Sequence, residues 1–322
     1  MIHRPRRLRA TAAIRELVAE VSLTPANLMQ PIFVREGLSA PREIMGMPGV
    51  LQHTETSFLT ELDRALSAGV VSVMLFAIPE SRDPEGSAAL DPNGILNRAV
   101  RAARAHVSDH LVIVADLCLD EFTSHGHCGV LGASGAVDND GTLEAYGLMA
   151  LELARAGADL LGASGMMDGQ VGHVRKVLDQ NGFDGTGILA YAAKYASTFY
   201  GPFRNAVESE LTGNRKTYQQ DYRNRTESIR GISLDLEQGA DIVMVKPALC
   251  YLDIVSAAAG ISSVPVAAYL VSGELAMIES AAANGFIDRD GAIWEALYSV
   301  RRAGAQIICT YWAIEFAQKL KG

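Results

Sequence analysis

The stretch from Glu237 to Lys246 reads EQGADIVMVK, and it shows the pattern on which the fold depends. A glycine ends an amphipathic segment, and a short, uninterrupted run of apolar residues follows it. Glycine adopts the left-handed conformation that ends many helices, and a continuous apolar run suits a strand that is buried on both faces. The stretch therefore predicts a helix, a turn and a buried strand in succession.

The same pattern recurs along the chain. It appears at Gly69 before VVSVMLFAI, at Gly157 before ADLLGAS and at Gly304 before AQIICTY. Strands alternating with helices form a parallel sheet. The apolar runs predict eight strands, at 28–34, 70–76, 111–115, 158–162, 188–192, 241–245, 264–270 and 306–309. Amphipathic segments predict helices between most of them, including 57–68, 94–105, 142–156 and 290–303.

Eight strand–helix units predict an α/β protein that folds as a closed (β/α)8 TIM barrel with an extended N-terminal arm. An open, doubly wound sheet is the alternative. However, no G-x-G-x-x-G motif, the main signature of the open dinucleotide-binding fold, follows an early strand. No low-complexity linker interrupts the pattern. We expect two parts, an arm over residues 1–25 and a barrel domain over residues 26–322.

The composition excludes several other classes of protein. Of the 322 residues, 49% are hydrophobic, which is too many for a disordered chain. No apolar run reaches the roughly 18–20 residues of a membrane span. The net charge of −9 argues against a nucleic-acid partner, since phosphate binding favours a basic surface. The basic N-terminus lacks the apolar segment of a secretory signal, so we expect a cytoplasmic protein that binds neither membranes nor nucleic acids.

The cysteine content also indicates a reducing compartment, because four cysteines are too few for a disulfide framework in a chain of this length. Cys250 and Cys309 lie within apolar runs, where a free cysteine usually behaves as a small hydrophobic residue. Both are therefore predicted to be buried in the core.

Two lysines stand at the ends of neighbouring predicted strands. The active site of a TIM barrel lies at the carboxyl ends of its strands, so Lys194 and Lys246 should both point into the barrel mouth. Burial and a second ammonium nearby should lower the pKa of Lys246. A neutral amine is what Schiff-base chemistry with a carbonyl substrate requires. The alternative is that the lysines pair with carboxylates across the barrel.

One segment gathers several metal-binding residue types. It contains Cys118, Asp120, His125, His127 and Cys128, and Zn²⁺ accepts thiolate, imidazole and carboxylate ligands. The spacing lacks the C-x₂₋₄-C pairs of a structural zinc finger. It therefore favours a site with few protein ligands and an open position over a closed structural site. A loop in which these residues are incidental is the alternative.

The segment 195–219 is long and carries several cationic side chains, including Arg204, Arg215 and Lys216. Long ordered loops over barrel mouths are commonly lids, and arginine on a lid can bind a carboxylate or phosphate through two hydrogen bonds. The segment is predicted to be a lid, with a solvated charged loop as the alternative.

Seven motifs resemble the porphobilinogen synthase (5-aminolevulinate dehydratase) family, and the resemblance covers essentially the whole chain. They are FTSHGHCG, MDGQVG, AYAAKYASTFYGPFR, NRKTYQ, MVKPALCYLDIV, YLVSGE and TYWA. The resemblance implies a TIM barrel whose N-terminal arm wraps a neighbouring subunit, usually in a homo-octamer. It also implies the condensation of two 5-aminolevulinate molecules to porphobilinogen with loss of two waters, an early step of tetrapyrrole (heme) synthesis.

The resemblance assigns catalytic roles to three residues. Lys246 matches the lysine that forms a Schiff base with the first-bound substrate. Lys194 matches a second lysine, which holds the other substrate or also forms an imine with it. Asp116 matches a carboxylate near the reacting centre that is suited to proton transfer.

The resemblance also assigns residues that bind the carboxylates of the two substrates. Ser272 and Tyr311 match groups that bind one carboxylate, and Arg204, Arg215 and Gln219 match lid residues that bind the other. Ser164, which follows the fourth predicted strand, is a further candidate for substrate binding.

The chain departs from the family pattern at two metal sites. Zinc-dependent members carry three cysteines in the metal-binding segment, and other members carry aspartates and no catalytic zinc. Here Cys118 and Cys128 match two of the cysteines, and Asp120 takes the middle position. Two thiolates favour zinc over a hard cation, so we expect Zn²⁺ at these three residues.

The second departure is at Gly231, where members with an allosteric Mg²⁺ site carry a glutamate. Glycine offers no ligand, and we expect the nearby Asp235 and Glu237 to point elsewhere on a helix. The sequence therefore predicts little response to Mg²⁺.

Two other functions are alternatives to porphobilinogen synthesis. Another Schiff-base-forming, class I aldolase-like barrel lyase would explain Lys246, but not Lys194 together with the cysteine-containing segment. A non-catalytic protein on an inherited barrel would be favoured by the loss of either lysine, and both are present.

Overall fold

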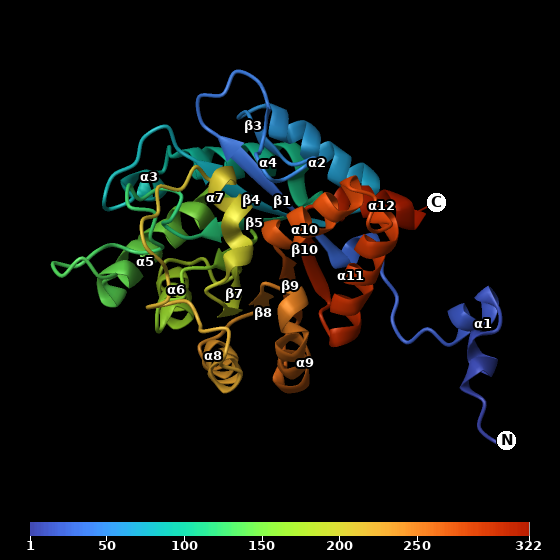
Figure 1. The fold of residues 1–322 in the computed structure, drawn as a ribbon. Coiled ribbons are helices and arrows are strands. Elements are labelled where there is room, and N and C mark those ends of the chain that lie inside the picture. The colour runs from blue at the N-terminus through green and yellow to red at the C-terminus, as the bar shows by residue number, and fades with distance from the viewer. Residues whose placement is uncertain (322) are drawn as a thin grey trace.

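A closed barrel of parallel strands lies at the centre of the computed structural model, which describes residues 1–321 (Figure 1). The strands pair in chain order, and the last barrel strand pairs with the first through Leu28↔Ile308 and Met29↔Cys309. This closure confirms the predicted barrel and excludes the open sheet. The barrel strands are β1 (Leu28–Arg35), β4 (Ser72–Ile78), β5 (Val112–Leu117), β6 (Leu160–Ala163), β7 (Gly187–Lys194), β8 (Ile242–Lys246), β9 (Val266–Leu270) and β10 (Ile307–Thr310).

Helices surround the barrel, and several end at the predicted glycines. Gly69, Gly157 and Gly304 follow three of these helices with φ values of 82°, 100° and 117°, a region that favours glycine. The four helices predicted by residue range are present, with ends within three residues of those expected. The main helices are α2 (Ser57–Ala68), α4 (Ile95–Val107), α5 (Asn139–Ala156), α6 (Gln170–Gln180), α8 (Thr226–Glu237), α9 (Leu252–Ile261), α10 (Ser272–Ala283), α11 (Arg289–Ala303) and α12 (Ala313–Lys321).

Two short strands, three short helices and five 3₁₀ turns lie outside the predicted elements. β3 (Leu51–His53) pairs with β1 beyond the barrel, and β2 (Arg42–Glu43) pairs antiparallel with β3. The short helices are α1 (Ala12–Leu17), α3 (Ser87–Leu90) and α7 (Gly201–Ala206), and the 3₁₀ turns are η1 (Pro5–Arg9), η2 (Pro25–Asn27), η3 (Ser108–His110), η4 (Thr198–Tyr200) and η5 (Leu249–Tyr251).

The strands form the core, and nearly every strand residue is buried. Cys309, on β10, is buried as expected. Cys250 is exposed, so its predicted burial is wrong. The apolar run that contains it follows Pro247 and forms the turn η5, which leaves the Cys250 side chain at the surface.

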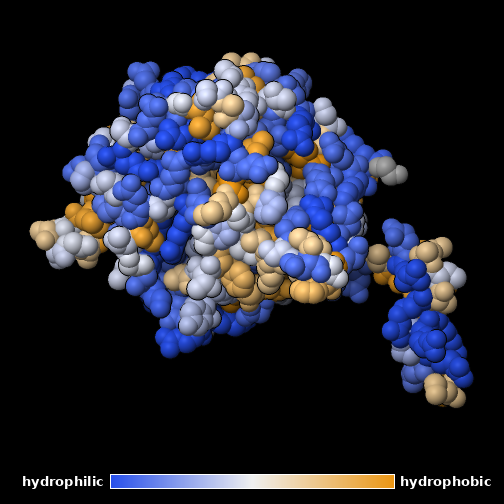
Figure 2. Space-filling model, turned by 45° about the horizontal axis from the view of Figure 1, so that its top comes forward, coloured by the Kyte–Doolittle hydropathy of each residue, from blue (hydrophilic) through white to orange (hydrophobic). Residues whose placement is uncertain are grey.

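The N-terminal segment extends away from the barrel (Figure 1). All residues from 1 to 20 are exposed except Ile14, which is half-buried. The segment includes the apolar side chains of Ile2, Leu8 and Leu17, and its surface is otherwise largely hydrophilic (Figure 2). Among residues 1–321, no helix has both the length and the apolar character needed to cross a membrane.

Candidate active site

A cavity of about 270 Å³ lies at the carboxyl ends of the barrel strands. The strand ends contribute Asp116, Ser164, Lys194 and Lys246, and residues 196–219 cover the opening. The cavity is therefore at the end of the barrel where the fold places active sites.

Lys194 and Lys246 occupy the last positions of β7 and β8 and lie opposite each other in the strand register. Both side chains are buried, with 4% and 5% of their surface exposed. The structure thus brings the two lysines together in one cavity.

The Lys246 amine lies among aromatic rings. Its Nζ is 4.3 Å from the ring centroid of Tyr269, 5.1 Å from those of Tyr191 and Phe203, and 5.5 Å from that of Tyr200. Burial, followed by the charge of Lys194, lowers the pKa of Lys246 to about 8. This is the direction expected from the sequence, and it gives Lys246 a larger neutral fraction near neutral pH than an ordinary lysine has.

Lys194 has a different environment. Its Nζ donates a hydrogen bond of 2.5 Å to the carbonyl oxygen of Ser164. Burial alone would lower its pKa, but the negative charges of Cys128, Cys118 and Asp120 outweigh this effect and raise it. Lys194 therefore retains its proton more firmly than an exposed lysine does.

Asp116, at the end of β5, lies on the cavity wall. The Ser164 hydroxyl donates a hydrogen bond of 3.4 Å to Asp116 Oδ2, and the buried Oδ1 has no partner within the described residues. Burial, followed by the charge of Asp120, raises the pKa of Asp116 to about 7. Such a carboxyl group can both accept and donate a proton near neutral pH.

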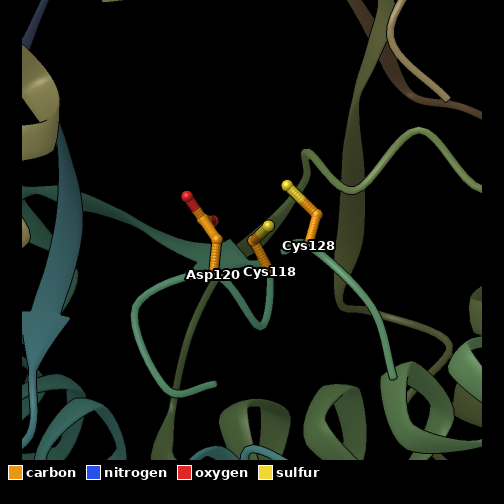
Figure 3. A group of neighbouring side chains, drawn as sticks. All are labelled: Cys118, Asp120 and Cys128. Atoms are coloured by element: carbon orange, nitrogen blue, oxygen red, sulfur yellow. The ribbon is translucent and has the colours of Figure 1, made fainter. Parts of the chain in front are cut away.

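The cysteine loop, residues 118–128, brings three donor atoms together. One sulfur or oxygen atom from each of Cys118, Asp120 and Cys128 lies within 4.8 Å of the others, and all three side chains are buried. They point to the same side of the loop (Figure 3). Two thiols and a carboxylate form a donor set that suits Zn²⁺, so these residues fit the predicted metal.

The two histidines of the loop lie outside this cluster. His125 Nε2 is 3.0 Å from the carbonyl oxygen of Pro84, and His127 Nδ1 is 3.0 Å from the Tyr218 hydroxyl. The Tyr146 hydroxyl donates to the carbonyl oxygen of Cys128 and also lies 3.8 Å from Cys118 Sγ. The imidazoles thus hold the loop in place and do not face the candidate ligands.

Glu121 is a candidate that sequence reasoning missed. Its carboxylate belongs to a second, overlapping group with Asp116, Cys118 and Asp120, also within 4.8 Å. The side chain is 2% exposed, lines the cavity and has no hydrogen-bond partner for Oε1 in residues 1–321. The only sequence signal was an acidic residue directly after Asp120.

The lid, residues 195–219, places its two arginines differently. Arg215 Nη2 donates to Asp120 Oδ2 and to the carbonyl oxygen of Gly126, each at 2.8 Å. Arg204 is exposed at the cavity opening and forms no salt bridge with the described residues. Gln219 is buried against the cavity, and its Nε2 has no partner there.

Ser272 and Tyr311 lie behind the cavity wall rather than on it. Ser272 Oγ accepts a hydrogen bond of 2.9 Å from the backbone nitrogen of Phe203 in the lid, and the Tyr311 hydroxyl is 3.1 Å from that of Tyr269. Their binding of a substrate carboxylate stays a prediction.

Comparison with known proteins decides the family. Residues 2–319 match the family model described as delta-aminolevulinic acid dehydratase. The chain belongs to the delta-aminolevulinic acid dehydratase family. A dehydratase from Streptomyces coelicolor is 57% identical over 320 residues, covering 99% of this chain and 97% of that protein. The Mycobacterium tuberculosis H37Rv dehydratase is 55% identical over 316 residues, with coverage of 98% and 96%.

A solved dehydratase structure has nearly the same fold. It comes from Toxoplasma gondii and contains the reaction product porphobilinogen. It superposes with a TM-score of 0.96 at 40% identity, covering 99% of this chain and 92% of that chain.

The face of α8 that carries Gly231 also carries Asp235. Gly231 and Asp235 line the same second cavity, of about 430 Å³, beside α6 and α8. The prediction that Asp235 points elsewhere is wrong, because residues four apart lie on one face of a helix. Burial raises the pKa of Asp235 to about 7.

Proposed function

We propose that the chain condenses two molecules of 5-aminolevulinate to porphobilinogen, with loss of two waters, in tetrapyrrole (heme) biosynthesis. The observation that carries this proposal is the pair of buried lysines at the ends of neighbouring strands in one cavity. Membership of the dehydratase family and the porphobilinogen-bound relative support it. The enzyme is a lyase.

Lys246 forms the first covalent bond in this proposal. Its neutral amine attacks the keto carbon of the first substrate, and the resulting carbinolamine loses water to give an imine. The lowered pKa of Lys246 favours the attacking form. The protonated imine makes its carbon an electrophile for the deprotonated carbon of the second substrate, and the Lys246 amine is expelled when the ring becomes unsaturated, which regenerates the enzyme.

Lys194 holds the second substrate. Its hydrogen bond to the carbonyl oxygen of Ser164 suits a protonated amine, which can also donate a hydrogen bond to the keto oxygen of that substrate. We assign the first nucleophilic attack to Lys246 because its pKa is lowered.

Asp116 moves protons between the reacting carbons and oxygens. Each lost water needs a proton on its oxygen, and the closing ring must lose a proton from carbon. A carboxyl group with a pKa of about 7 can serve in both directions. Ser164, which is hydrogen-bonded to Asp116, helps to orient it and faces the substrate.

Cys118, Asp120 and Cys128 would hold the metal, which we propose to be Zn²⁺. A bound zinc ion supplies Lewis-acid polarisation of an oxygen atom in the cavity. The two buried thiols make a soft donor set, which favours Zn²⁺ over Mg²⁺ at this position.

The carboxylates of the two substrates fix their orientation, which is a large part of catalysis for two flexible keto acids. We propose that Arg204, Arg215 and Gln219 bind one carboxylate from the lid. Ser272 and Tyr311 bind the second carboxylate, after the backbone nitrogen of Phe203 in the lid has released the Ser272 hydroxyl.

The assembly is proposed to be a homo-octamer in the cytoplasm. The arm, residues 1–25, makes contacts between subunits, and residues 26–322 form the catalytic domain. The exposed apolar side chains of the arm, such as Leu8 and Leu17, would be covered in such contacts. Size-exclusion chromatography with light scattering tests the number of subunits.

The function is tested by incubating the purified chain with 5-aminolevulinate and measuring porphobilinogen by mass spectrometry. The assay is run after chelation and with added Zn²⁺, Mg²⁺ or both. We expect porphobilinogen with Zn²⁺ and little extra effect of Mg²⁺. If no porphobilinogen forms under any of these conditions, the proposed function is wrong.

A further inference from the structure

The lid and the cysteine loop share a buried ion pair. Arg215 is the lid residue, with 12% of its side chain exposed, and Asp120 is the loop residue, with 4% exposed. The carboxylate that is a candidate metal ligand is therefore neutralised by a cation from the lid. Arg215 also lines the cavity, and its buried Nε has no hydrogen-bond partner within the described residues.

Other contacts fasten the same two segments together. The Cys128 backbone nitrogen donates to the Tyr218 hydroxyl at 3.3 Å. Arg82 donates to the carbonyl oxygen of Glu121 at 2.7 Å and to that of Val207 at 2.8 Å, so it bridges the loop and the lid.

The two backbones also approach closely at Gly126. A β-carbon at this position would lie 2.7 Å from the backbone nitrogen of Leu211, and the φ of +68° itself favours glycine. The lid thus rests directly on the loop that carries the candidate metal ligands.

We propose that Asp120 exchanges its Arg215 partner for a metal ion when the metal binds. Cys118, Asp120 and Cys128 would hold the ion, which would neutralise the charge of Asp120, and Arg215 would then be free to bind a substrate carboxylate in the cavity. This inference rests on the proposed function, because the carboxylate is that of the keto-acid substrate.

Electrostatics favours exchange over simultaneous binding. A divalent ion and a guanidinium on one buried carboxylate repel each other, and little solvent is available to screen them. Guanidinium pairs equally well with a substrate carboxylate through two hydrogen bonds. Once Arg215 is released from Asp120, it can therefore pair with a substrate carboxylate in the same cavity.

Exchange predicts a reciprocal coupling between metal and carboxylate. If the metal releases Arg215, it tightens carboxylate binding, and by linkage a bound carboxylate tightens metal binding by the same factor. Metal binding and substrate binding would then support each other through one arginine.

The first test measures Zn²⁺ affinity without substrate, by competition with a chromophoric chelator. Arg215→Gln removes the competing cation and should tighten Zn²⁺ binding by about tenfold. Arg204→Gln, on the same lid but without an ion pair, is the matched control and should leave the affinity unchanged. Unchanged or weaker Zn²⁺ binding in Arg215→Gln would overturn the proposal, as would the absence of Zn²⁺ binding in the unmodified chain.

The second test measures levulinate binding, and its first arm uses only the unmodified protein. Levulinate, the keto acid that lacks the substrate amine, is titrated with and without Zn²⁺. We expect Zn²⁺ to tighten levulinate binding by about tenfold, and the gain to disappear in Arg215→Gln. An equal gain in the variant, or no gain in the unmodified chain, contradicts the exchange.

A failure of the proposed function gives a different result. In that case no porphobilinogen forms, whatever the outcome of the Zn²⁺ and levulinate titrations. A failure of the exchange alone leaves porphobilinogen formation intact while the Zn²⁺ affinity of Arg215→Gln does not increase.

Discussion

Lys194 and Lys246 end neighbouring strands and face one cavity, but their surroundings have opposite character. Lys246 lies among four aromatic rings, whereas Lys194 lies beside the thiols and the carboxylate of the cysteine loop. Burial lowers the pKa of Lys246 to about 8, and negatively charged neighbours raise the pKa of Lys194 despite its burial. One residue type thus has a lowered pKa at the end of one strand and a raised pKa at the end of its neighbour.

The largest effect is expected from removing Lys246, the lysine that lies among the aromatic rings. Lys246→Ala loses the nucleophile, so the rate of porphobilinogen formation should fall by at least about 10³-fold. Borohydride reduction with bound 5-aminolevulinate, followed by peptide mass analysis, should place the adduct on Lys246. Lys194→Met is the matched control and should still form the Lys246 adduct. Full activity with an unmodified Lys246 would refute the assignment.

The surroundings of Lys194 are tested through the metal that we propose at Cys118, Asp120 and Cys128. Chelation should lower the rate by at least about tenfold, because a Lewis acid is lost, and added Zn²⁺ should restore it. Asp120→Cys adds a third, softer ligand and should tighten Zn²⁺ binding by about tenfold, as measured by chelator competition. If a preparation shown by elemental analysis to lack metal keeps its full rate, the zinc assignment is wrong.

The pH dependence of imine formation sharpens the comparison. Only the neutral amine attacks, so the rate of imine formation with levulinate should rise with pH and level off above the lowered pKa of about 8. Without the shift, the rise would continue toward the ordinary lysine value of 10.5. Lys194→Met removes the second cause of the shift and should move the inflection to higher pH. Borohydride trapping at short times gives the rates, and an inflection unchanged in Lys194→Met contradicts the coupling.

The backbone that follows Lys246 is held by a buried carboxyl group. Glu274 accepts hydrogen bonds of 2.6 Å from the backbone nitrogens of Leu249 and Val271. Glu274→Ala leaves both donors unpaired and should lower the free energy of unfolding by about 2–3 kcal/mol. Glu274→Gln keeps one acceptor oxygen and should lose less. Denaturant unfolding measures both variants, and equal losses would show that the hydrogen bonds do not account for the effect.

The smallest effect is expected outside the two lysine environments, at Gly231. Mg²⁺ takes few protein ligands and needs a carboxylate anchor, which this position lacks, so millimolar Mg²⁺ should change the rate and the size-exclusion profile little. Asp235 faces the same cavity and is the residue that would anchor the ion if this prediction fails. A several-fold activation that disappears in Asp235→Asn would identify it. Gly231→Glu is a less clean test, because its β-carbon would lie 3.0 Å from the carbonyl oxygen of Ala192.

The barrel could be predicted from the sequence because its signals are local. Each buried strand is a short apolar run, and Gly69, Gly157 and Gly304 mark helix ends through a backbone preference of the residue itself. The same reasoning failed at Cys250, since an apolar run suggests burial in the core but here forms a turn that leaves Cys250 exposed. Apolar composition alone does not distinguish the two.

The environment of each site residue was less predictable because its neighbours come from distant segments. The rings around Lys246 belong to β7, β9 and the lid, and the Arg215–Asp120 pair joins residues far apart in the chain. The strand ends indicated which side chains share the cavity, but not which of them pair. Glu121 was missed for the same reason, since its burial depends on packing that no local pattern encodes.

The pairing of β10 with β1 has a consequence for how the chain is made. The barrel closes only when Met29 meets Cys309, and these residues lie near opposite ends of the sequence. A chain emerging from a ribosome therefore exposes two unpaired sheet edges until its last strand has been synthesised, and such edges are templates for aggregation. In the folded protein, the strand order of residues 1–321 ends at the two-residue β2, formed by Arg42 and Glu43, which is too short and too charged to recruit another strand.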